Sequence, residues 1–354
     1  MPAMTTQNWR EDRLSSVDDQ TDIVIVGGGP AGTAAAIWAA GTGLRTILLD
    51  RPQRDDPVPG ETLHPGVAVL FERLGVEKSI IAASQIRHEG LWTAGQGQFG
   101  FTPFGSDEAG PWRGFQIERS ELRRIMLERA KDAGATVMCL RAERPILSRG
   151  KICAVETPHG IIPCRFLIDA SGHSHWLARM RAEPVLQLSS QLIAWYGWAK
   201  SKRAHEFASP VFKFDEMGWT WIAQVETDIC AWTRLGFRIG KNARLRKPGA
   251  LRDFRAVARE RGTDVTWRTV HSHAGGGYFR AGDAGAVLDP AASQGVLRAL
   301  ITGIAAAQSC ARILRLGADE SLEAANFNRW IERMLRVSTA SLRNLYGFDA
   351  AVRR

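Results

Sequence analysis

Residues 21–50 have the sequence TDIVIVGGGPAGTAAAIWAAGTGLRTILLD, and this stretch decides the fold. It begins with a short apolar, β-branched run, which is typical of a buried parallel strand. An alanine-rich segment that favours a helix follows, and then a second apolar run that predicts another strand. The turn between the first strand and the helix has the pattern G-x-G-x-x-G, whose glycines are Gly27, Gly29 and Gly32.

A strand, a glycine-rich turn and a helix in this order can hold a dinucleotide. The first glycine permits the tight turn, the second lets the backbone approach a pyrophosphate, and the third lets the helix pack closely on the strand. The helix N-terminus presents free N–H groups and a partial positive charge to the phosphates. Asp50, at the end of the second strand, can accept hydrogen bonds from a ribose diol. Residues 21–50 therefore predict a dinucleotide-binding βαβ unit.

Length and composition are those of a globular protein with an ample core: 354 residues, of which 45% are hydrophobic. No apolar run reaches about 18 residues, so we expect no transmembrane helix. The polar residues 1–20 predict a disordered tail rather than a signal peptide. Five scattered cysteines without a C-x-x-C pair indicate reduced, cytoplasmic thiols and no metal site.

The net charge of +9 raises the question of nucleic-acid binding. The basic residues are spread along the chain, and no known nucleic-acid-binding module is visible. We therefore expect an arginine-rich surface and no nucleic-acid partner. An anionic cofactor accounts for part of the positive charge, and an acidic protein partner would account for more.

Four later segments add to the first motif. They are G-E-T-L-H-P at 60–65, F-Q-I-E-R-S-E-L at 115–122, D-A-S-G with L-A-R at 169–179, and G-D-A-x-x-x-x-D-P-x-x-S-x-G-V at 282–296. Together with residues 21–50 they resemble the aromatic hydroxylases and the flavin-dependent tryptophan halogenases. The resemblance implies an α/β fold, the glutathione-reductase-type FAD-binding Rossmann fold, with an inserted antiparallel β-sheet substrate domain.

The resemblance also assigns residues to FAD. It implies that Asp283 bonds the ribityl chain and that Arg119 lies along the cofactor. Pro290 and Gly295 would pass beside the isoalloxazine ring, with the helix that begins near Gly295 pointing its N-terminus at the flavin. The complete set of expected cofactor-binding residues is Gly27, Gly29, Gly32, Asp50, Arg51, Thr62, Arg119, Asp169, Gly172, Asp283, Pro290, Gly295 and Val296.

The domain division follows from these matches. Residues 183–270 are rich in tryptophan and alternate with strand period two, so they predict a sheet. Within them, residues 241–261 are basic and are expected to form a helix-and-loop excursion. We expect a tail at 1–20, an FAD-binding domain of 21–82, 112–182 and 271–320, a substrate domain of 83–111 and 183–270, and a C-terminal helix within 321–354.

Two departures distinguish the chain from the halogenases that it resembles. Halogenases carry a relay lysine after the G-E-T loop, but residues 83–90 contain none, and Ile86 or Arg87 falls in its place. Their W-x-W-x-I-P element begins here at Trp219 and Trp221 but lacks the Ile-Pro. Both departures favour hydroxylation over halogenation.

The expected function is that of an FAD-dependent monooxygenase acting on an aromatic substrate, indole or tryptophan, through a flavin C4a-hydroperoxide. The match extends to the flavoprotein hydroxylases that mature tryptophylquinone enzymes, which implies a peptide or protein precursor as substrate. Only one dinucleotide fingerprint exists, so electrons come from transiently bound NAD(P)H or from a separate reductase, and O2 is the oxidant. Oligomeric state is not indicated.

Alternatives remain open from the sequence. They are a flavin-dependent halogenase, a reductase or dehydrogenase of the geranylgeranyl-reductase type, and a flavoprotein chaperone without catalysis. The candidate residues of the substrate pocket are His64, Trp219 and Trp221. His64 equally suits a loop histidine bonded to backbone, and most tryptophans of this region equally suit sheet-core packing.

Overall fold

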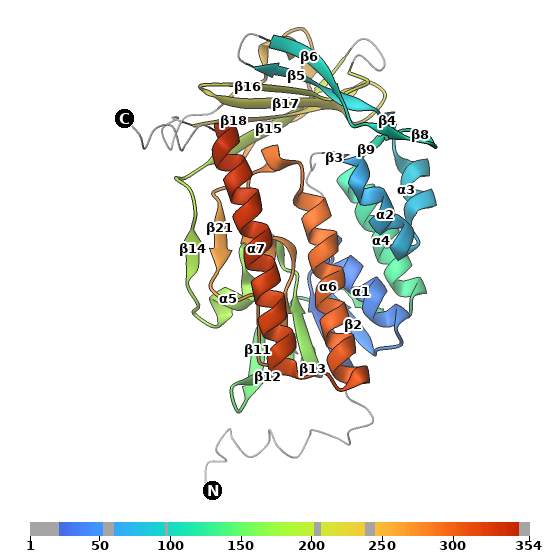
Figure 1. Ribbon diagram of the computed structural model, residues 1–354, viewed down its shortest axis with the longest axis vertical. Helices are drawn as coiled ribbons and strands as arrows, with labels where there is room; N and C mark the ends of the chain where they lie inside the picture. The colour runs from blue at the N-terminus through green and yellow to red at the C-terminus, as the bar shows by residue number, and fades with distance from the viewer. Residues whose placement is uncertain (1–20, 52–59, 96–97, 202–206, 238–244, 347–354) are drawn as a thin grey trace, which may run out of the picture.

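The computed structural model describes residues 21–51, 60–95, 98–201, 207–237 and 245–346. One large sheet with helices against it forms one half of the protein, and a second large sheet covers one end of that half (Figure 1). The tail predicted at residues 1–20 lies outside the described residues. The end of the predicted C-terminal segment, 347–354, lies outside them too.

The first sheet has a parallel centre, as the βαβ pattern predicts, with strand order β10-β2-β1-β13-β23. Its strands are β1 (Thr21–Val26), β2 (Thr46–Leu49), β10 (Thr136–Met138), β13 (Gly160–Asp169) and β23 (Tyr278–Arg280). Antiparallel strands extend it: β11 (Arg144–Ser148) and β12 (Lys151–Thr157) from the first half of β13, and β22 (Ala274–Gly275) from β23.

Three long helices lie beside this sheet. Helix α1 (Pro30–Gly41) packs on α6 (Gly295–Leu316), while α4 (Arg119–Asp132) contacts α1 from another side. The α1–α6 contact is close because both helices are small at the crossing: a Cβ on Gly303 would lie 2.1 Å from the carbonyl oxygen of Ala31. This contact brings the N-termini of α1 and α6 into the same region of the fold.

Helix α6 is long and apolar enough to cross a membrane, the single helix of the described residues with that property. In this structure 56% of the relevant segment is buried inside the protein. Its buried side includes Leu300, Ala306 and Cys310, which belong to the main core. The hydropathy of α6 is therefore accounted for by its place in the core.

The second large sheet has the order β6-β5-β16-β17-β18-β15, with β19 and β20 both paired to β15. All of its neighbouring strands are antiparallel except β5 and β16, which are parallel. The strands are β5 (Gly90–Gly95), β6 (Gln98–Pro103), β15 (Ile193–Lys200), β16 (Val211–Asp215), β17 (Gly218–Gln224), β18 (Ile229–Gly236), β19 (Arg255–Ala256) and β20 (Arg261–Asp264). This is the sheet that the tryptophan-rich segment predicted.

The described part of residues 241–261 does not form the basic helix that the sequence predicted. It contains a 3-10 turn, Gly249–Leu251, and the short strands β19 and β20. The physical reason is the free edge of β15, which offers its backbone groups for pairing, for instance with Thr263 opposite Ala194. Residues 241–244 lie outside the described residues.

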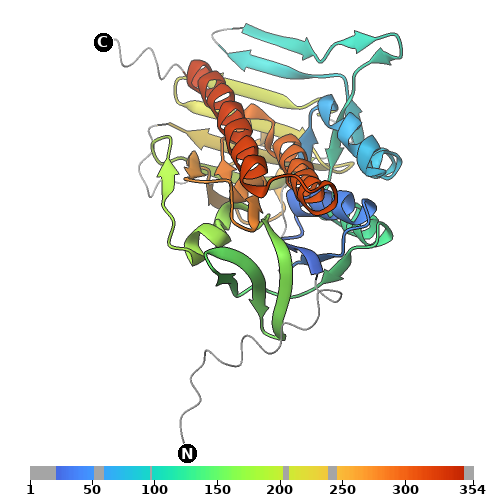
Figure 2. The same cartoon turned by 60° about the horizontal axis from the view of Figure 1, so that its bottom comes forward.

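Helix α7 (Glu320–Tyr346) connects the two halves, as both views show (Figures 1 and 2). Phe327, Ile331 and Leu335 recur at a spacing of four on one face and are buried, as is typical of an amphipathic helix. The remaining elements are α2 (Ala68–Leu74), α3 (Glu77–Ala83), α5 (Trp176–Met180), the sheet β3 (Glu61–Leu63)–β9 (Gly114–Ile117)–β4 (Ile86–His88), the sheet β14 (Val185–Gln187)–β21 (Arg268–Val270)–β24 (Ala286–Val287), and the pair β7 (Ser106–Asp107)–β8 (Gly110–Pro111).

Candidate cofactor and substrate site

The three motif glycines between β1 and α1 have different reasons to be glycine. Gly27 has φ +110°, and a Cβ there would lie 2.4 Å from the carbonyl oxygen of Ala170. A Cβ on Gly32 would lie 1.8 Å from the carbonyl oxygen of Gly27. A Cβ on Gly29 would meet no atom within 4 Å. Gly27 and Gly32 are therefore required by the fold, whereas Gly29 borders space that no described residue occupies.

The N-termini of α1 and α6 both lack a side-chain cap. The residues that precede them, Gly29 and Gln294, make no side-chain capping bond, so the first N–H groups of both helices lack a capping acceptor. Gly295 is exposed, and a Cβ on it would also meet nothing within 4 Å, while Val296 beside it is buried. Pro290 is exposed as well. Two helix N-termini thus combine partial positive charge with open backbone.

Charged side chains accompany these helix ends. Arg119, the first residue of α4, lies 2.6 Å from Glu61, and its side chain is half-exposed. The Glu61 carboxylate chiefly raises the pKa of Arg119, and Asp283 adds to the effect. Asp283 lies 3.3 Å from Arg298, yet 44% of its side chain is exposed. The Asp283 carboxylate is therefore held in place and still able to accept hydrogen bonds from a ligand.

The imidazole of His173 lies among the same charged side chains. Burial is the main cause that lowers its pKa, and Arg268, Arg51 and Arg119 lower it further, while Asp283 raises it. Arg51, two residues after the end of β2, is exposed. Several arginines thus surround the region near Asp283, which suits a ligand that carries phosphate charges.

The two remaining predicted carboxylates are engaged within the protein. Asp50 accepts a hydrogen bond from the Gly28 N–H at 3.1 Å and forms an ion pair with Arg123. It therefore braces the glycine loop, and the ribose contact stays a prediction. Asp169 has no exposed surface, and its two oxygens accept from the N–H groups of Ser171 at 3.0 Å and Leu177 at 3.1 Å. The cofactor contact predicted for Asp169 is thus not open in this structure.

Thr62 and Gly172 complete the predicted cofactor set. The Thr62 hydroxyl donates to the Oε1 atom of Gln116 at 2.9 Å, between β3 and β9. Gly172 has φ +73°, and a Cβ on it would meet nothing within 4 Å. Gly172 therefore needs to be glycine for its backbone conformation, and the space beside it is free. A cofactor contact of either residue stays a prediction.

The candidate substrate residue His64 has a clear local role. It precedes the 3-10 turn Pro65–Val67, and its Nδ1 atom accepts a hydrogen bond from the Gly66 N–H at 3.0 Å. Its ring also packs edge-on against Phe104, with 5.0 Å between the ring centroids. His64 is exposed, so a loop-bracing role through Nδ1 leaves its Nε2 atom available to a ligand.

The tryptophans of β17 differ from each other. Trp219 is 3% exposed, and its indole N–H donates to the Tyr346 hydroxyl at 3.0 Å. The pocket role predicted for Trp219 therefore gives way to the alternative of core packing, because its ring and its N–H are both used inside the protein. Trp221 lies two residues further on the same face and is only half-buried. It remains a candidate for contact with substrate.

The sequence analysis did not identify His88 as a candidate residue, although it lies within residues 83–90, where a lysine was sought. His88, at the end of β4, is 2% exposed, and neither ring nitrogen has a hydrogen-bond partner among the residues that the structure describes. Arg87 points the other way: it stacks on Phe115 at 3.9 Å and donates to the Gly114 carbonyl oxygen. The available signal was Gly114, which lies opposite His88 and leaves room for its ring.

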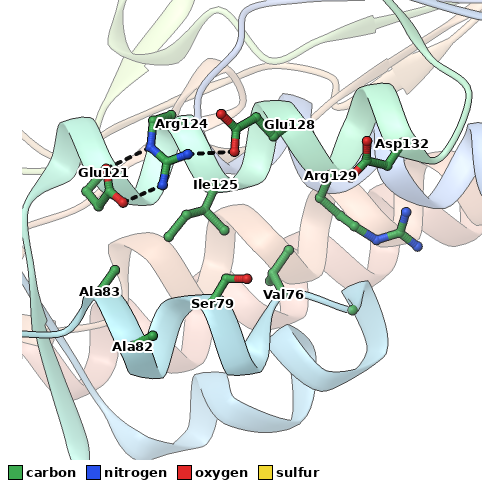
Figure 3. Close-up of a pocket in the computed structure, with 11 residues that line it drawn as sticks. Val76, Ser79, Ala82, Ala83, Glu121, Arg124, Ile125, Glu128, Arg129 and Asp132 are labelled. Atoms are coloured by element: carbon green, nitrogen blue, oxygen red, sulfur yellow. Dashed lines mark hydrogen bonds and ion pairs between the residues drawn. The ribbon is translucent and has the colours of Figure 1, made fainter.

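A surface cavity of about 460 Å³ lies elsewhere, between α3 and α4 (Figure 3). Arg124 pairs there with Glu121 at 2.5 Å and with Glu128 at 2.6 Å, all on α4. None of the predicted site residues lines this cavity. Its charges neutralise one another along one helix, which is the usual arrangement of a solvated helix face.

Comparison with known proteins shows which fold these elements form. Residues 20–144 match the family model of the FAD binding domain. Over 93% of its length the chain superposes on 88% of the flavin-dependent brominase Bmp2, with a TM-score of 0.83 and 20% identity. The chain has an FAD-binding fold. This confirms the fold class predicted from the motifs, a mixed α/β FAD-binding fold.

The curated proteins that the chain is similar to include a reductase and a halogenase. The menaquinone reductase of Mycolicibacterium smegmatis is 31% identical over 201 residues, which cover 54% of this chain and 47% of that protein. The tryptophan 2-halogenase of Chondromyces crocatus is 25% identical over 328 residues, which cover 83% of this chain and 62% of that protein. The chain therefore spans less than two thirds of either relative.

The residues present fit FAD. Gly29 and Gly295 leave space beside two helix N-termini, where phosphates and the electron-rich edge of a flavin are stabilised. Arg298 adds a buried guanidinium whose Nε atom has no hydrogen-bond partner in the described part of the chain, and Asp283 adds a partly exposed carboxylate. Open backbone, positive charge and one acceptor are what a dinucleotide with a hydroxylated chain requires.

Proposed function

We propose that this chain is an FAD-dependent monooxygenase that hydroxylates an aromatic substrate, with the indole of a tryptophan as the favoured ring. The observation that carries the proposal is the combination of an FAD-binding site around Gly29 and Gly295 with a sheet whose inner face is aromatic. Phe212, Phe214 and Trp221 share that face with Trp219 and are only half-buried. Flat rings of this kind suit a flat substrate.

The residues of the chain have separate tasks in this proposal. When bound, FAD supplies the activation of O2 and the transfer of one oxygen atom to the ring. The α1 N-terminus and Arg119 bind the anionic part, and the Asp283 carboxylate accepts from hydroxyl groups of the cofactor. The aromatic face of β16 and β17 orients the substrate ring and keeps water out.

A halogenase is the second candidate, because a tryptophan 2-halogenase and a brominase are among the similar proteins. The chain offers no primary amine in residues 83–90, all of which are described, and the guanidinium of Arg87 faces Phe115 on the helix side. A relay of halogen through a lysine at this place is therefore absent. We expect hydroxylation and no halide incorporation.

The experiment supplies FAD-loaded protein with reduced flavin, O2, bromide and either indole or a tryptophan-containing peptide. Mass spectrometry is expected to show a product heavier by one oxygen atom and no brominated product. A brominated product would establish the halogenase instead. Reduction of a quinone or of an isoprenoid double bond without O2, as the menaquinone reductase relative suggests, would establish the third alternative, a reductase.

We further propose that the substrate is a peptide or protein, as in tryptophylquinone biogenesis. The hairpin β5–β6 carries three exposed aromatic rings, and Trp92 stacks on Phe99 with 5.0 Å between centroids, while Phe101 packs edge-on against Trp92. Such a group on one hairpin is a surface that a partner can bury. The net charge of +9 favours an acidic partner.

This part of the proposal predicts that product forms efficiently only with the partner. NAD(P)H or reduced-flavin oxidation should be coupled to product when an acidic tryptophan-bearing protein is present, and uncoupled with free tryptophan. Product and cofactor consumption are measured together in one assay. Equal rates for free tryptophan and for every candidate protein would replace this proposal with a small-molecule hydroxylase.

A further inference from the structure

The outer side of helix α7 is a rigid, exposed surface. The inner side of the helix is fixed to the rest of the protein by buried residues such as Phe327 and Ile331. Asn328 adds a polar anchor, since its Oδ1 atom accepts from the His273 N–H at 2.8 Å. Both views show α7 at the surface of the molecule (Figures 1 and 2). The outer side of α7 is therefore fully formed without a partner.

Four arginines form one row on this outer side. They are Arg329, Arg333, Arg336 and Arg343, and all four are exposed. At 3.6 residues per turn they fall within about 80° of the helix circumference, opposite the buried face. The rise of 1.5 Å per residue spreads them over about 21 Å along the helix. We call these four residues the arginine row.

The arginine row has no carboxylate partner among the described residues. Arg329 donates to the side-chain oxygen of Asn326 at 2.6 Å, and the other three members form no ion pair within the described ranges. Helix α4 shows the contrast, because its Arg124 lies between Glu121 and Glu128 and pairs with both. The positive charge that α4 neutralises within itself is thus left open on α7.

The acidic residues of α7 do not neutralise the row. Glu320 pairs with Lys151 of β12. Glu323 pairs with Arg312 of α6 at 2.7 Å. Glu332 is exposed and forms no ion pair in the described part of the chain. Residues 329–346 therefore carry four arginines against one glutamate, an excess of three positive charges.

Exposed apolar side chains accompany the arginine row. Trp330 and Val337 lie seven residues apart and so share one flank of the helix. Leu322 lies in line with the row, nearer to the start of α7, and is also exposed. Basic groups interspersed with an indole and aliphatic side chains are typical of helices that lie at the boundary between lipid headgroups and hydrocarbon.

We propose that the outer side of α7 docks the protein on the surface of an anionic lipid bilayer. The guanidinium groups of the arginine row contact headgroup phosphates, and Trp330 and Val337 enter the headgroup region. The inference is independent of the proposed function, because it uses no residue of the cofactor or substrate site.

A bilayer suits this surface better than other polyanions do. Contact with nucleic-acid phosphates would leave the aliphatic Leu322 and Val337 in water. A protein partner is held most strongly by side chains that enter desolvated pockets, whereas the arginine row is a convex ridge on a straight helix. A planar array of phosphates above a hydrocarbon layer accepts both the charges and the apolar groups.

The first test measures co-sedimentation of the FAD-loaded protein with vesicles. Vesicles of phosphatidylcholine mixed with phosphatidylglycerol should bind the protein, and vesicles of phosphatidylcholine alone should not. High salt should release it, because the Debye length falls from about 10 Å at 0.1 M to about 3 Å at 1 M. Absence of binding to the anionic vesicles at low salt would overturn the inference. Tighter binding to a DNA duplex or to polyglutamate than to these vesicles at equal salt would overturn it too.

Charge variants assign the binding to α7. The double variant Arg333→Gln, Arg336→Gln should bind the anionic vesicles about 25-fold more weakly, since each arginine near such a surface contributes about fivefold. The matched control, Arg73→Gln with Arg141→Gln, removes two charges from exposed positions on other segments and should bind as wild type does. FAD content and unfolding should be unchanged in both. Equal weakening in the two double variants would mean that net charge alone drives binding, which contradicts the inference.

Trp330 reports which side of the protein faces the lipid. Bromine-labelled phosphatidylglycerol quenches indole fluorescence by contact, so wild type should lose part of its emission on binding. The protein has 12 tryptophans, and the Trp330→Phe variant identifies the ring that responds. This variant should still bind through the arginine row but should lose most of the quenching. Quenching equal to that of wild type would place another exposed indole, such as Trp92 of β5, on the lipid and would refute docking through α7.

Discussion

At the scale of single residues, the glycines show which positions serve the fold and which serve a ligand. Gly27 and Gly32 exclude a side chain because backbone atoms occupy its place. Gly29 lies between them in sequence but borders open space. Glycine thus stands at the three positions of G-x-G-x-x-G for different reasons. Of the three, only Gly29 can be replaced by alanine without a clash with described backbone atoms.

This difference gives the first prediction. In Gly29→Ala the new methyl group should lie where the phosphates approach and weaken FAD binding by several kcal/mol, while the unfolding free energy of the FAD-free protein stays within about 0.5 kcal/mol. Fluorescence titration with FAD and urea unfolding measure the two effects. Gly41→Ala, at the other end of α1, also meets nothing within 4 Å and should change neither. A Gly29→Ala protein that kept its FAD affinity would contradict the motif assignment.

At the scale of elements, hydrogen bonds between distant segments decide what sequence patterns leave open. The strand Gly90–Gly95 and the buried face of α7 follow from local periodicity, so both could be predicted. The buried state of Trp219 could not, because it depends on Tyr346, 127 residues away. The orphan imidazole of His88 likewise depends on Gly114, which reaches it only through strand pairing.

The second prediction compares the two tryptophans of β17. Trp219→Ala should destabilise the protein by about 3–5 kcal/mol, because it empties a core position and removes the anchor of the α7 C-terminus. Trp221→Ala should cost less, since Trp221 is half-buried, and should instead lower the coupling of cofactor oxidation to product. Urea unfolding, FAD content and product yield are measured for both variants. The assignment fails if Trp219→Ala is as stable as wild type.

Tyr346→Phe tests the α7 anchor without opening a cavity. The ring remains in contact with Phe214 and Phe237, while the hydroxyl that accepts from Trp219 and also interacts with the Asp289 carboxylate is lost. Removing this hydroxyl from two buried polar groups should cost about 1–3 kcal/mol. A melting temperature equal to that of wild type would show that this hydrogen bond does not hold the helix end.

At the scale of the whole molecule, buried neutral histidines set the response to acid. Burial chiefly lowers the pKa of His88 and of His273 to about 4, and neighbouring arginines add to the effect. His273 lies in the FAD-binding half, and its Nε2 atom is 3.3 Å from the Thr269 hydroxyl. His88 ends β4, whereas His273 lies in the connection between β21 and β22, and neither lowers the pKa of the other, so their contributions should add.

The fourth prediction follows from the sign of these shifts. The unfolded chain binds a proton at each histidine below about pH 6.5, while the folded protein does so only near pH 4. The stabilisation is therefore complete above pH 6.5 and is lost as the pH falls toward 4, by about 2 kcal/mol per histidine between pH 6.5 and 5.

Burial raises the pKa of Asp289, which acts in the opposite direction, so the wild-type curve alone does not isolate the histidines. The comparison with His88→Gln and with the double variant His88→Gln, His273→Gln removes Asp289, because all three proteins share it. Urea unfolding at pH 7.5 and pH 5 should show wild type losing the most stability, the single variant less, and the double variant least. Equal losses in all three would mean that these imidazoles accept protons as readily in the folded protein as in the unfolded chain, so that burial does not hold them neutral at pH 5.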